Sequence, residues 1–232
     1  MEKIKPMLTM NGSVEKWYPA TIDTLRAHLS VLIVKNAFFT ESKVIPLRNN
    51  IAYNLQYIEF LDRVIKDINL SDVLLKQNIK SFVVHSAAVI EAIFYYLVVS
   101  SGNAATSDWI SCNKFKSNPY TLNGGEFQNE TEIFAKSDHP INLEMTFDQM
   151  SKKVTKKRLL GEVGELYKEI GGIRKLRNKI HIYSIENLSE TDYNSFQKSE
   201  YRLTRNVLLG ILTSPIFSAS KNQKCYDYLK ND

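Results

Sequence analysis

The sequence predicts an all-α protein, a helical bundle with an irregular or β-hairpin insertion at about 103–143. Over most of the chain, apolar residues recur at steps of three and four, which is the period of one face of a helix. Between 103 and 143 this period fails, and turn-forming combinations of Asn, Gly, Asp, Ser and Pro take its place. A chain of 232 residues that is 44% hydrophobic and 24% charged is long enough to bury a sizeable core.

Three helices are expected before the insertion, over 19–38, 46–68 and 72–100. A proline in the first turn begins each of the first two helices, and Ser71 is the expected N-cap of the third. From Phe82 onward the third helix is apolar on nearly all sides, which is typical of a helix surrounded by others. His28 lies beside the apolar stripe of the first helix, and we expect it at the polar edge of that packed helix.

The composition indicates a cytoplasmic protein without a membrane span. The stretch 81–99 comes nearest to a span, but it contains His85 and Glu91, and a charged residue inside a bilayer is costly. The amino terminus has no apolar region after its basic residues, so no secretory signal is expected. Cys112 and Cys225 are far apart, which indicates neither a disulfide framework nor a zinc site.

The second half of the chain is expected to return to helices. Within the insertion, Asn123-Gly124-Gly125 between short alternating runs predicts a hairpin turn, and 138–140 predicts another turn. Helical spacing then resumes at Phe147 and runs from Leu159 to 180, where Gly171-Gly172 should bend the helix. One further helix is expected from a cap near 189 to about 213, followed by a short helix near 226–229. The single domain 1–232 thus comprises N-terminal helices (14–102), the insertion (103–143), motif-bearing helices (144–213) and a tail (214–232).

Positive charge is concentrated in one block of the chain. Residues 151–181 contain ten Lys or Arg against three Glu, a local net charge of +7, whereas the whole chain carries +5. A block of this kind is either a solvated surface or a nucleic-acid contact, and both interpretations remain open. The candidate RNA contacts are Lys156, Lys157, Arg158, Lys175 and Lys179.

The end of this block gathers polar residues on one face of a helix. Arg174, Arg177 and Asn178 precede His181 by seven, four and three residues, so a helix places all four side chains within an arc of about 100°. The other face carries Ile173, Leu176 and Ile180, which form an apolar stripe. One face therefore packs while the other presents cations beside an imidazole.

The residues 176–183, LRNKIHIY, late in an all-helical chain, resemble the signature of the HEPN superfamily. That signature is an Arg, often followed by a polar residue such as Asn, then four to six residues and a His. The resemblance covers about eight of the 232 residues. It implies a HEPN-like helical bundle, typically dimeric, and an activity found in many members: metal-independent RNA cleavage in toxin–antitoxin, abortive-infection and CRISPR-linked systems. It implies no cofactor and no metal.

The sequence departs from the signature in its spacing. Arg177 has the expected Asn178 after it, but only three residues separate it from His181. Arg174 has six residues before His181, but Lys175 follows it. Both arginines remain candidates, and we favour Arg177 with Asn178, with Arg174 as a second phosphate ligand.

Two further residues, Tyr183 and Glu91, are candidates for a role at this site. His181 and Tyr183 resemble the His-x-Tyr arrangement of HEPN toxins whose tyrosine is modified by a partner nucleotidyltransferase, which implies an antitoxin or nucleotidyltransferase partner. The alternative interpretation of Tyr183 is a packing residue. Glu91, on the apolar third helix, needs a partner if it is buried. It is expected either in a salt bridge with another helix or as the acid that orients an arginine of the 174–181 cluster.

RNA cleavage by the 2′-hydroxyl of the substrate needs a base, an acid and cations that stabilise the charge on the phosphoryl oxygens. A single His can be base or acid but not both at once, and a two-fold homodimer would supply a pair. Two functions remain open, an RNA endonuclease of this kind and a non-catalytic HEPN-like module that binds nucleic acid or a protein. The cation-rich face favours the first, and the three-residue spacing favours the second.

Overall fold

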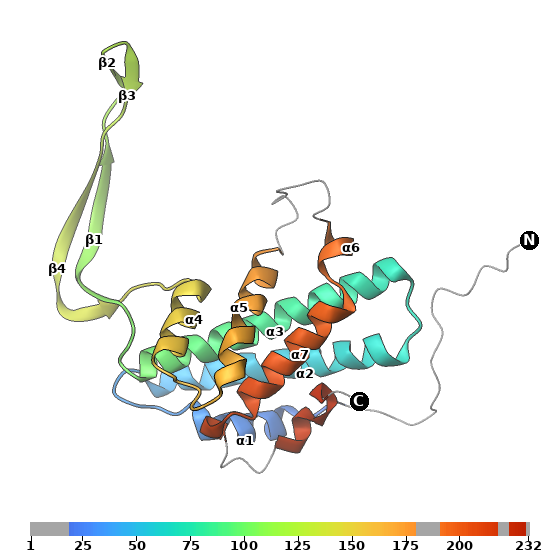
Figure 1. The fold of residues 1–232 in the computed structure, drawn as a ribbon. Helices are drawn as coiled ribbons and strands as arrows, with labels where there is room; N and C mark the ends of the chain where they lie inside the picture. Colours follow the sequence, from blue (N-terminus) through green and yellow to red (C-terminus); the bar gives the residue numbers. More distant parts are fainter. Residues whose placement is uncertain (1–18, 180–190, 218–222, 231–232) are drawn as a thin grey trace, which may run out of the picture. The chain divides into compact units, whose positions relative to one another are not determined.

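The computed structural model describes residues 19–179, 191–217 and 223–230 (Figure 1). The chain forms two units, one made of residues 1–102 and 147–232 and the other of residues 103–146. The described part of the first unit is helical, and the second unit consists of β-strands. The mainly helical fold with a hairpin insertion is the one that the sequence predicts, although the second unit ends at 146 instead of 143.

The first helices begin and end elsewhere than predicted. Helix α1 (Ile22–Leu32) ends six residues before 38, and α2 (Glu41–Asp67) begins five residues before Pro46. Pro46 therefore lies inside α2, where it removes one backbone hydrogen bond. The cost is limited because Pro46 itself is exposed and water can bind the carbonyl that lacks its donor. The carbonyl of Thr40 begins the helix by accepting from the backbone N–H groups of Lys43 and Val44, each at 3.0 Å.

Helix α3 (Asp72–Ser100) has the predicted bounds and forms the centre of the helical unit. It packs against α2, which runs beside it, and against helices from the second half of the chain (Figure 1). Within the described residues it is the one helix long and apolar enough to cross a membrane. However, 67% of its most apolar window is buried inside the protein, as expected of a core helix.

The second half begins with α4 (Phe147–Lys156) and α5 (Gly164–Asn178). The continuous helix predicted from Leu159 is wrong, because Arg158 and Gly161 have φ angles of 50° and 81° and turn the chain before α5 begins. Helix α5 continues through Gly171 and Gly172. At Gly172 the small residue permits close packing, because a Cβ there would lie 2.8 Å from a methyl group of Leu203.

The last predicted helix is divided into two. Helix α6 (Asp192–Ser195) is capped by Thr191, and not by a residue near 189, and α7 (Lys198–Leu212) follows after a break. The break arises because Gln197 and Glu200 form a capping box that begins a new helix. Two short 3-10 helices complete the unit, η1 (Pro215–Phe217) and η2 (Gln223–Leu229), the second close to the predicted short helix.

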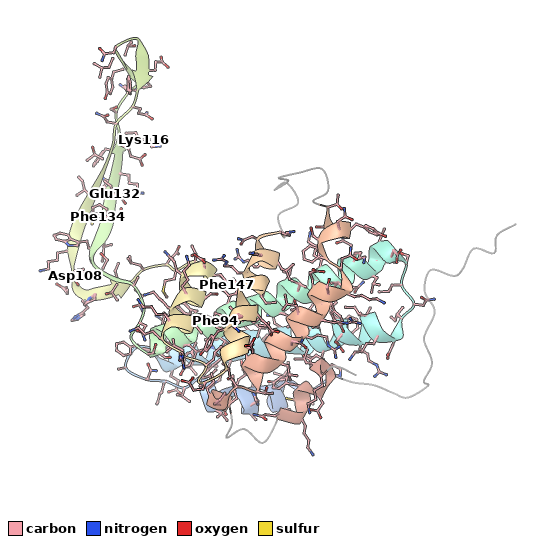
Figure 2. All side chains as sticks on the ribbon, viewed as in Figure 1. Phe94, Asp108, Lys116, Glu132, Phe134 and Phe147 are labelled. Atoms are coloured by element: carbon pink, nitrogen blue, oxygen red, sulfur yellow. The ribbon has the colours of Figure 1, made fainter. Side chains whose placement is uncertain are left out.

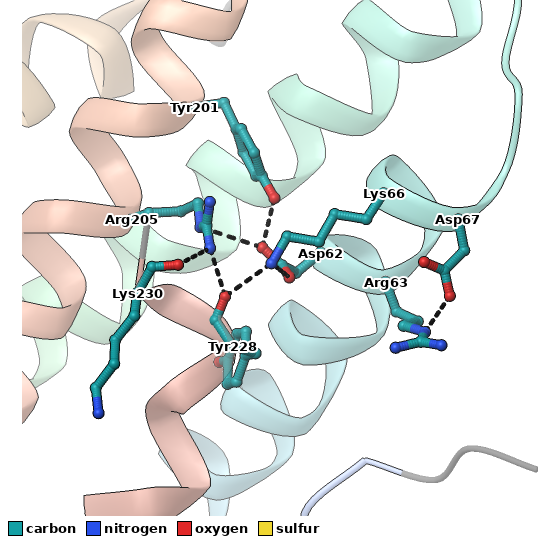
Figure 3. A network of polar contacts seen from close by, with 8 residues as sticks. All are labelled: Asp62, Arg63, Lys66, Asp67, Tyr201, Arg205, Tyr228 and Lys230. Atoms are coloured by element: carbon teal, nitrogen blue, oxygen red, sulfur yellow. Dashed lines mark hydrogen bonds and ion pairs between the residues drawn. The ribbon is translucent and has the colours of Figure 1, made fainter. Parts of the chain in front are cut away.

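A buried carboxylate connects α2 to α7. Asp62 is 2% exposed, and the hydroxyl of Tyr201 donates a hydrogen bond to it (Figure 3). Lys66 Nζ lies 2.9 Å from one Asp62 oxygen, and Arg205 Nε lies 3.4 Å from the other. Two cations and a hydroxyl thus surround one carboxylate, which compensates for its removal from water.

The same cations hold the C-terminal turn. The Arg205 guanidinium donates to the carbonyls of Tyr228 and Lys230, each at 2.6 Å, and Lys66 donates to the Tyr228 carbonyl at 3.0 Å (Figure 3). Carbonyls at the end of a helix have no partner within the helix, and cationic side chains can satisfy them. The network therefore fixes η2 against α2 and α7.

His28 is buried, whereas the sequence analysis expected it at the polar edge of α1. Its ring stacks on Phe217 at a centroid distance of 4.7 Å and meets Tyr226 edge-on at 4.8 Å. Its Nε2 lies 3.1 Å from the carbonyl oxygen of Leu212, which is a hydrogen bond when that nitrogen carries the proton. The prediction failed because η1 and η2 cover the His28 side of α1. The spacing of apolar residues within α1 cannot show that a distant segment packs on it. Burial lowers the pKa of His28 from 6.5 to about 4.

This pKa predicts that the protein loses stability between about pH 6.5 and pH 4. In that range the unfolded chain binds a proton at His28 and the folded protein does not, so lowering the pH favours unfolding. The expected loss is roughly 3 kcal/mol in total, about 1.4 kcal/mol for each pH unit. Urea unfolding at half-unit pH steps measures it, and His28→Gln should show a shallower slope than the wild type. Equal slopes in the two proteins would contradict the assignment.

The strand unit consists of β1 (Thr106–Lys116), β2 (Tyr120–Leu122), β3 (Gly125–Phe127) and β4 (Glu130–Asn142). Strands β1 and β4 form an antiparallel ribbon, and β2 pairs with β3 across the predicted turn. Asn123 and Gly124 have positive φ angles, as a two-residue hairpin turn requires. The turn predicted at 138–140 is wrong, because these residues belong to β4, where the pairing skips from Lys136 to Ile141.

The register divides the ribbon into two different faces. Lys114 and Lys116 of β1 form ion pairs with Glu132 and Glu130 of β4, at 3.3 and 3.5 Å, on one face. Figure 2 labels Lys116 and Glu132 on the two strands. The pairing places Ile110, Phe115, Ile133 and Ala135 on the other face, together with Asn113 and Thr131. The paired residues of that face carry no charge.

Candidate functional site

Helices α3, α4 and α5 pack against one another and position the predicted site residues. The rings of Phe94 of α3 and Phe147 of α4 pack with their centroids 6.0 Å apart and so join α3 to α4 (Figure 2). Ile170, Ile173 and Leu176 are the buried residues on the middle and end of α5. Because this stripe faces the core, the arginines between its members lie at the edge of the packed helices.

Arg177 forms an ion pair with Glu91 of α3. The nearest atoms, Arg177 Nη2 and Glu91 Oε2, are 3.4 Å apart, and both side chains are partly exposed, at 38% and 28%. An arginine of the 174–181 cluster was one predicted partner of Glu91, and the contact is present. At this length the contact is a weak hydrogen bond, so the two charges attract without fixing the guanidinium rigidly. A role for Glu91 in orienting Arg177 for catalysis stays a prediction.

Arg174 pairs with Asp148, a residue that the sequence analysis missed. Asp148 lies in the first turn of α4, and Lys152 Nζ approaches its other oxygen at 2.8 Å. The sequence signal that could have identified Asp148 is an acidic residue just before the basic block, in the first turn of a predicted helix. The guanidinium of Arg174 is therefore already paired with a carboxylate, and a bound phosphate would compete with Asp148 for this guanidinium.

A pocket of about 320 Å³ lies between α4 and α5. Its lining includes three cations, Lys152, Lys156 and Arg174, and the carboxylate of Asp148. Ser151 also lines it. This side chain is 8% exposed, and its hydroxyl has no hydrogen-bond partner among the described residues.

Tyr167 forms part of the same pocket wall and fixes the start of α5. Its hydroxyl donates to the carbonyl of Gly161 and accepts from the backbone N–H of Leu160, both at 3.0 Å. Burial raises the pKa of this phenol above its ordinary value, so the ring remains uncharged at neutral pH. Because the hydroxyl is already paired, Tyr167 adds mainly aromatic surface to the pocket.

The other predicted residues are distributed around this site. Asn178 is the last residue of α5, and Lys175 and Lys179 are exposed near the end of the same helix. Lys157 and Arg158 lie in the turn after α4, where Arg158 pairs with Glu162. His181 and Tyr183 lie outside the described residues, so their relation to Arg174 and Arg177 stays a prediction.

A second pocket, of about 480 Å³, lies between α1 and the start of α2. It includes Arg26, Arg48 and Asn49, and the last two repeat the Arg-Asn pair of the motif. The Nε of Arg48 donates to the carbonyl of Ile33 at 2.6 Å, so this guanidinium secures the end of α1. We therefore take the α4–α5 pocket with Arg177 as the candidate site.

Among the residues that the structure describes, no group of three or more His, Cys, Asp or Glu side chains is arranged to hold a metal ion. Comparisons of the chain with protein-family models, curated proteins and solved structures found no match.

Proposed function

We propose that this protein is a metal-independent RNA endonuclease of the HEPN type that acts as a cytoplasmic homodimer. The observation that carries the proposal is the alignment of cations from two packed helices. Lys152 and Lys156 of α4 and Arg174 of α5 line one pocket, and Arg177 follows one turn later on α5. Cations gathered from two helices onto one surface can follow the phosphates of a single RNA strand.

In the proposed reaction the 2′-hydroxyl of the substrate attacks the adjacent phosphate. His181 accepts the proton of that hydroxyl, and the second His181 of the dimer donates a proton to the leaving 5′-oxygen. Arg177 stabilises the negative charge that develops on the phosphoryl oxygens. Glu91 attracts one nitrogen of the Arg177 guanidinium from the side of α3, and the other N–H groups of that guanidinium can donate to the phosphate.

One observation favours the alternative, a non-catalytic module that binds nucleic acid or a protein. Arg174 and Arg177 each pair with a carboxylate of another helix, so both can serve helix packing alone. In that case the basic surface binds without cleaving, and Tyr183 is a packing residue. In the catalytic case an antitoxin or a nucleotidyltransferase that modifies Tyr183 is the expected partner.

The proposal predicts RNA binding that weakens steeply with salt. Each phosphate contact to a single strand contributes a slope of about −0.7 to log K against log salt concentration, because counterions are released. Fluorescence anisotropy with a labelled single-stranded RNA between 50 and 200 mM salt measures the slope. Lys156→Ala should reduce its magnitude by roughly 0.7, whereas Lys116→Ala, on the strand ribbon, should not change it. A flat salt dependence would exclude the α4–α5 surface as the contact.

A further inference from the structure

We propose that the α4–α5 pocket binds one nucleotide unit, with the phosphate among its three cations and the base against its aromatic and apolar wall. The inference deepens the proposed function, on which it rests for the RNA itself, by naming the part of the substrate that the pocket holds. Bound there, the unit would lie one helical turn from Arg177.

The volume of the pocket suits a ligand of this size. Pockets for small ligands range from about 300 to 1,000 Å³, and about 320 Å³ is at the lower end. A single nucleotide fits such a space, whereas a double helix would have to stay outside it. The pocket therefore selects an unpaired nucleotide.

The charges favour a phosphate with one additional hydrogen-bond donor. The lining contains the cations Lys152, Lys156 and Arg174 and the single carboxylate of Asp148, which gives it a net charge of +2. Asp148 is acceptor-only when ionised, and its two oxygens offer more lone pairs than its two cationic partners use. It can accept from the amino group of a base or from a ribose hydroxyl. The lining thus matches a nucleotide better than an isolated anion.

Ser151 supplies the independent observation. Ser151 lines the pocket and is more than nine-tenths buried, and its hydroxyl is without a partner among the described residues. A buried hydroxyl without a partner is unfavourable, and a ligand oxygen in the pocket would satisfy it.

The remaining wall offers a surface for a base. Tyr167 contributes a neutral ring, and Ile170 contributes an apolar side chain. Gly171 leaves the wall open, since a Cβ at that position would meet nothing within 4 Å. Bases stack on aromatic side chains, and a glycine allows close approach to the helix backbone.

Gly171→Leu tests the pocket because a Cβ at this position meets nothing within 4 Å and the longer side chain would occupy space in the pocket. Gly164→Leu is the matched control, since Gly164 begins the same helix, also faces open space, and lies outside the lining. Ser151→Ala is a second variant. Calorimetric titration with each nucleoside 5′-monophosphate, with inorganic phosphate, and with a single-stranded 2′-O-methyl oligoribonucleotide measures affinity. The last probe cannot be cleaved because it lacks the attacking hydroxyl. Thermal unfolding checks the fold of each variant.

We expect Gly171→Leu to weaken binding of at least one monophosphate tenfold or more, with Gly164→Leu unchanged and inorganic phosphate bound more weakly than the monophosphate. Ser151→Ala should weaken binding several-fold while its melting temperature stays equal or rises, which a structural hydroxyl would not do. If Gly171→Leu weakens the oligonucleotide as well, the nucleotide belongs to an RNA strand, and otherwise it is a free nucleotide.

Unchanged binding of every probe by folded Gly171→Leu would overturn the inference, as would a wild type that binds none of them. These results are separable from failure of the ribonuclease. A wild type that binds nucleotides through the pocket but cleaves no RNA would refute cleavage and leave the pocket standing. If Gly171→Leu cleaves RNA with an unchanged KM, the pocket is refuted as a nucleotide site and cleavage stands.

Discussion

His181→Ala is expected to slow RNA cleavage by about 10²–10⁴-fold, which is the usual contribution of a proton-transferring side chain. The hypothesis follows from the sequence, in which His181 shares a predicted helix face with Arg174 and Arg177. RNA affinity should remain nearly unchanged, because a neutral imidazole attracts phosphate only weakly. Single-turnover cleavage of a labelled RNA at saturating protein measures the rate. The matched control is His139→Ala, an exposed histidine on β4, which should leave the rate unchanged.

The chemistry of the products and a variant at Arg177 provide two further tests of the proposed cleavage. Attack by a 2′-hydroxyl leaves a 2′,3′-cyclic phosphate, and because side chains move the protons, a chelator should not change the rate. Arg177→Ala should lower both the rate and the affinity, since the guanidinium attracts the phosphate before and during the reaction. Cleavage that persists in His181→Ala, or a wild type that cleaves no RNA, would leave the binding module as the function.

Asp62→Ala is expected to lower the free energy of unfolding by about 3–5 kcal/mol. The substitution leaves Arg205, which is 5% exposed, and the half-buried Lys66 without their shared carboxylate. It also removes the acceptor of the Tyr201 hydroxyl. Uncompensated buried charge is costly because the low dielectric of the interior replaces the hydration of the ions. Urea unfolding monitored by circular dichroism at constant pH measures the loss.

Asp67→Ala is the matched control on the same helix. Asp67 pairs with Arg63, and the two side chains are 30% and 41% exposed (Figure 3). Exposed pairs contribute about 0–1 kcal/mol, because water screens them and solvates each partner alone. If Asp62→Ala fails to fold, Tyr201→Phe, which removes one donor, should fold with a loss of about 1 kcal/mol. Equal losses in Asp62→Ala and Asp67→Ala would mean that the network adds nothing to stability.

The sequence predicted those parts of the fold that local patterns determine. Helix α3 has the predicted bounds because its apolar run, the polar residue before it and Gly102 after it all agree. The turn at Asn123 and Gly124 was predicted because few residues adopt positive φ angles without strain. The break between α6 and α7 was missed because the apolar period continues through it, although Gln197 and Glu200 form a new cap.

The candidate site shows the same division between local and long-range information. A glutamate in an apolar helix needs a partner, so the pairing of Glu91 with Arg177 could be anticipated. Asp148 was missed because its importance depends on α4 lying against α5, and the helical period does not specify which helices are neighbours. The Ser151 hydroxyl and the pocket volume arise from the same packing, so they too could be found only in three dimensions.

The network around Asp62 has a consequence for the order in which the chain matures during synthesis. The carbonyl of Tyr228, which Lys66 and Arg205 both bind, is separated from Lys66 by 162 positions in the sequence. A chain that has been synthesised only through α7 can pair Asp62 with its cations, but it lacks the carbonyls that share those cations. The covering of His28 by η2 waits for the same residues. The helical unit therefore acquires its full stability only when η2 has joined it, and a chain truncated before η2 is the form most exposed to proteases.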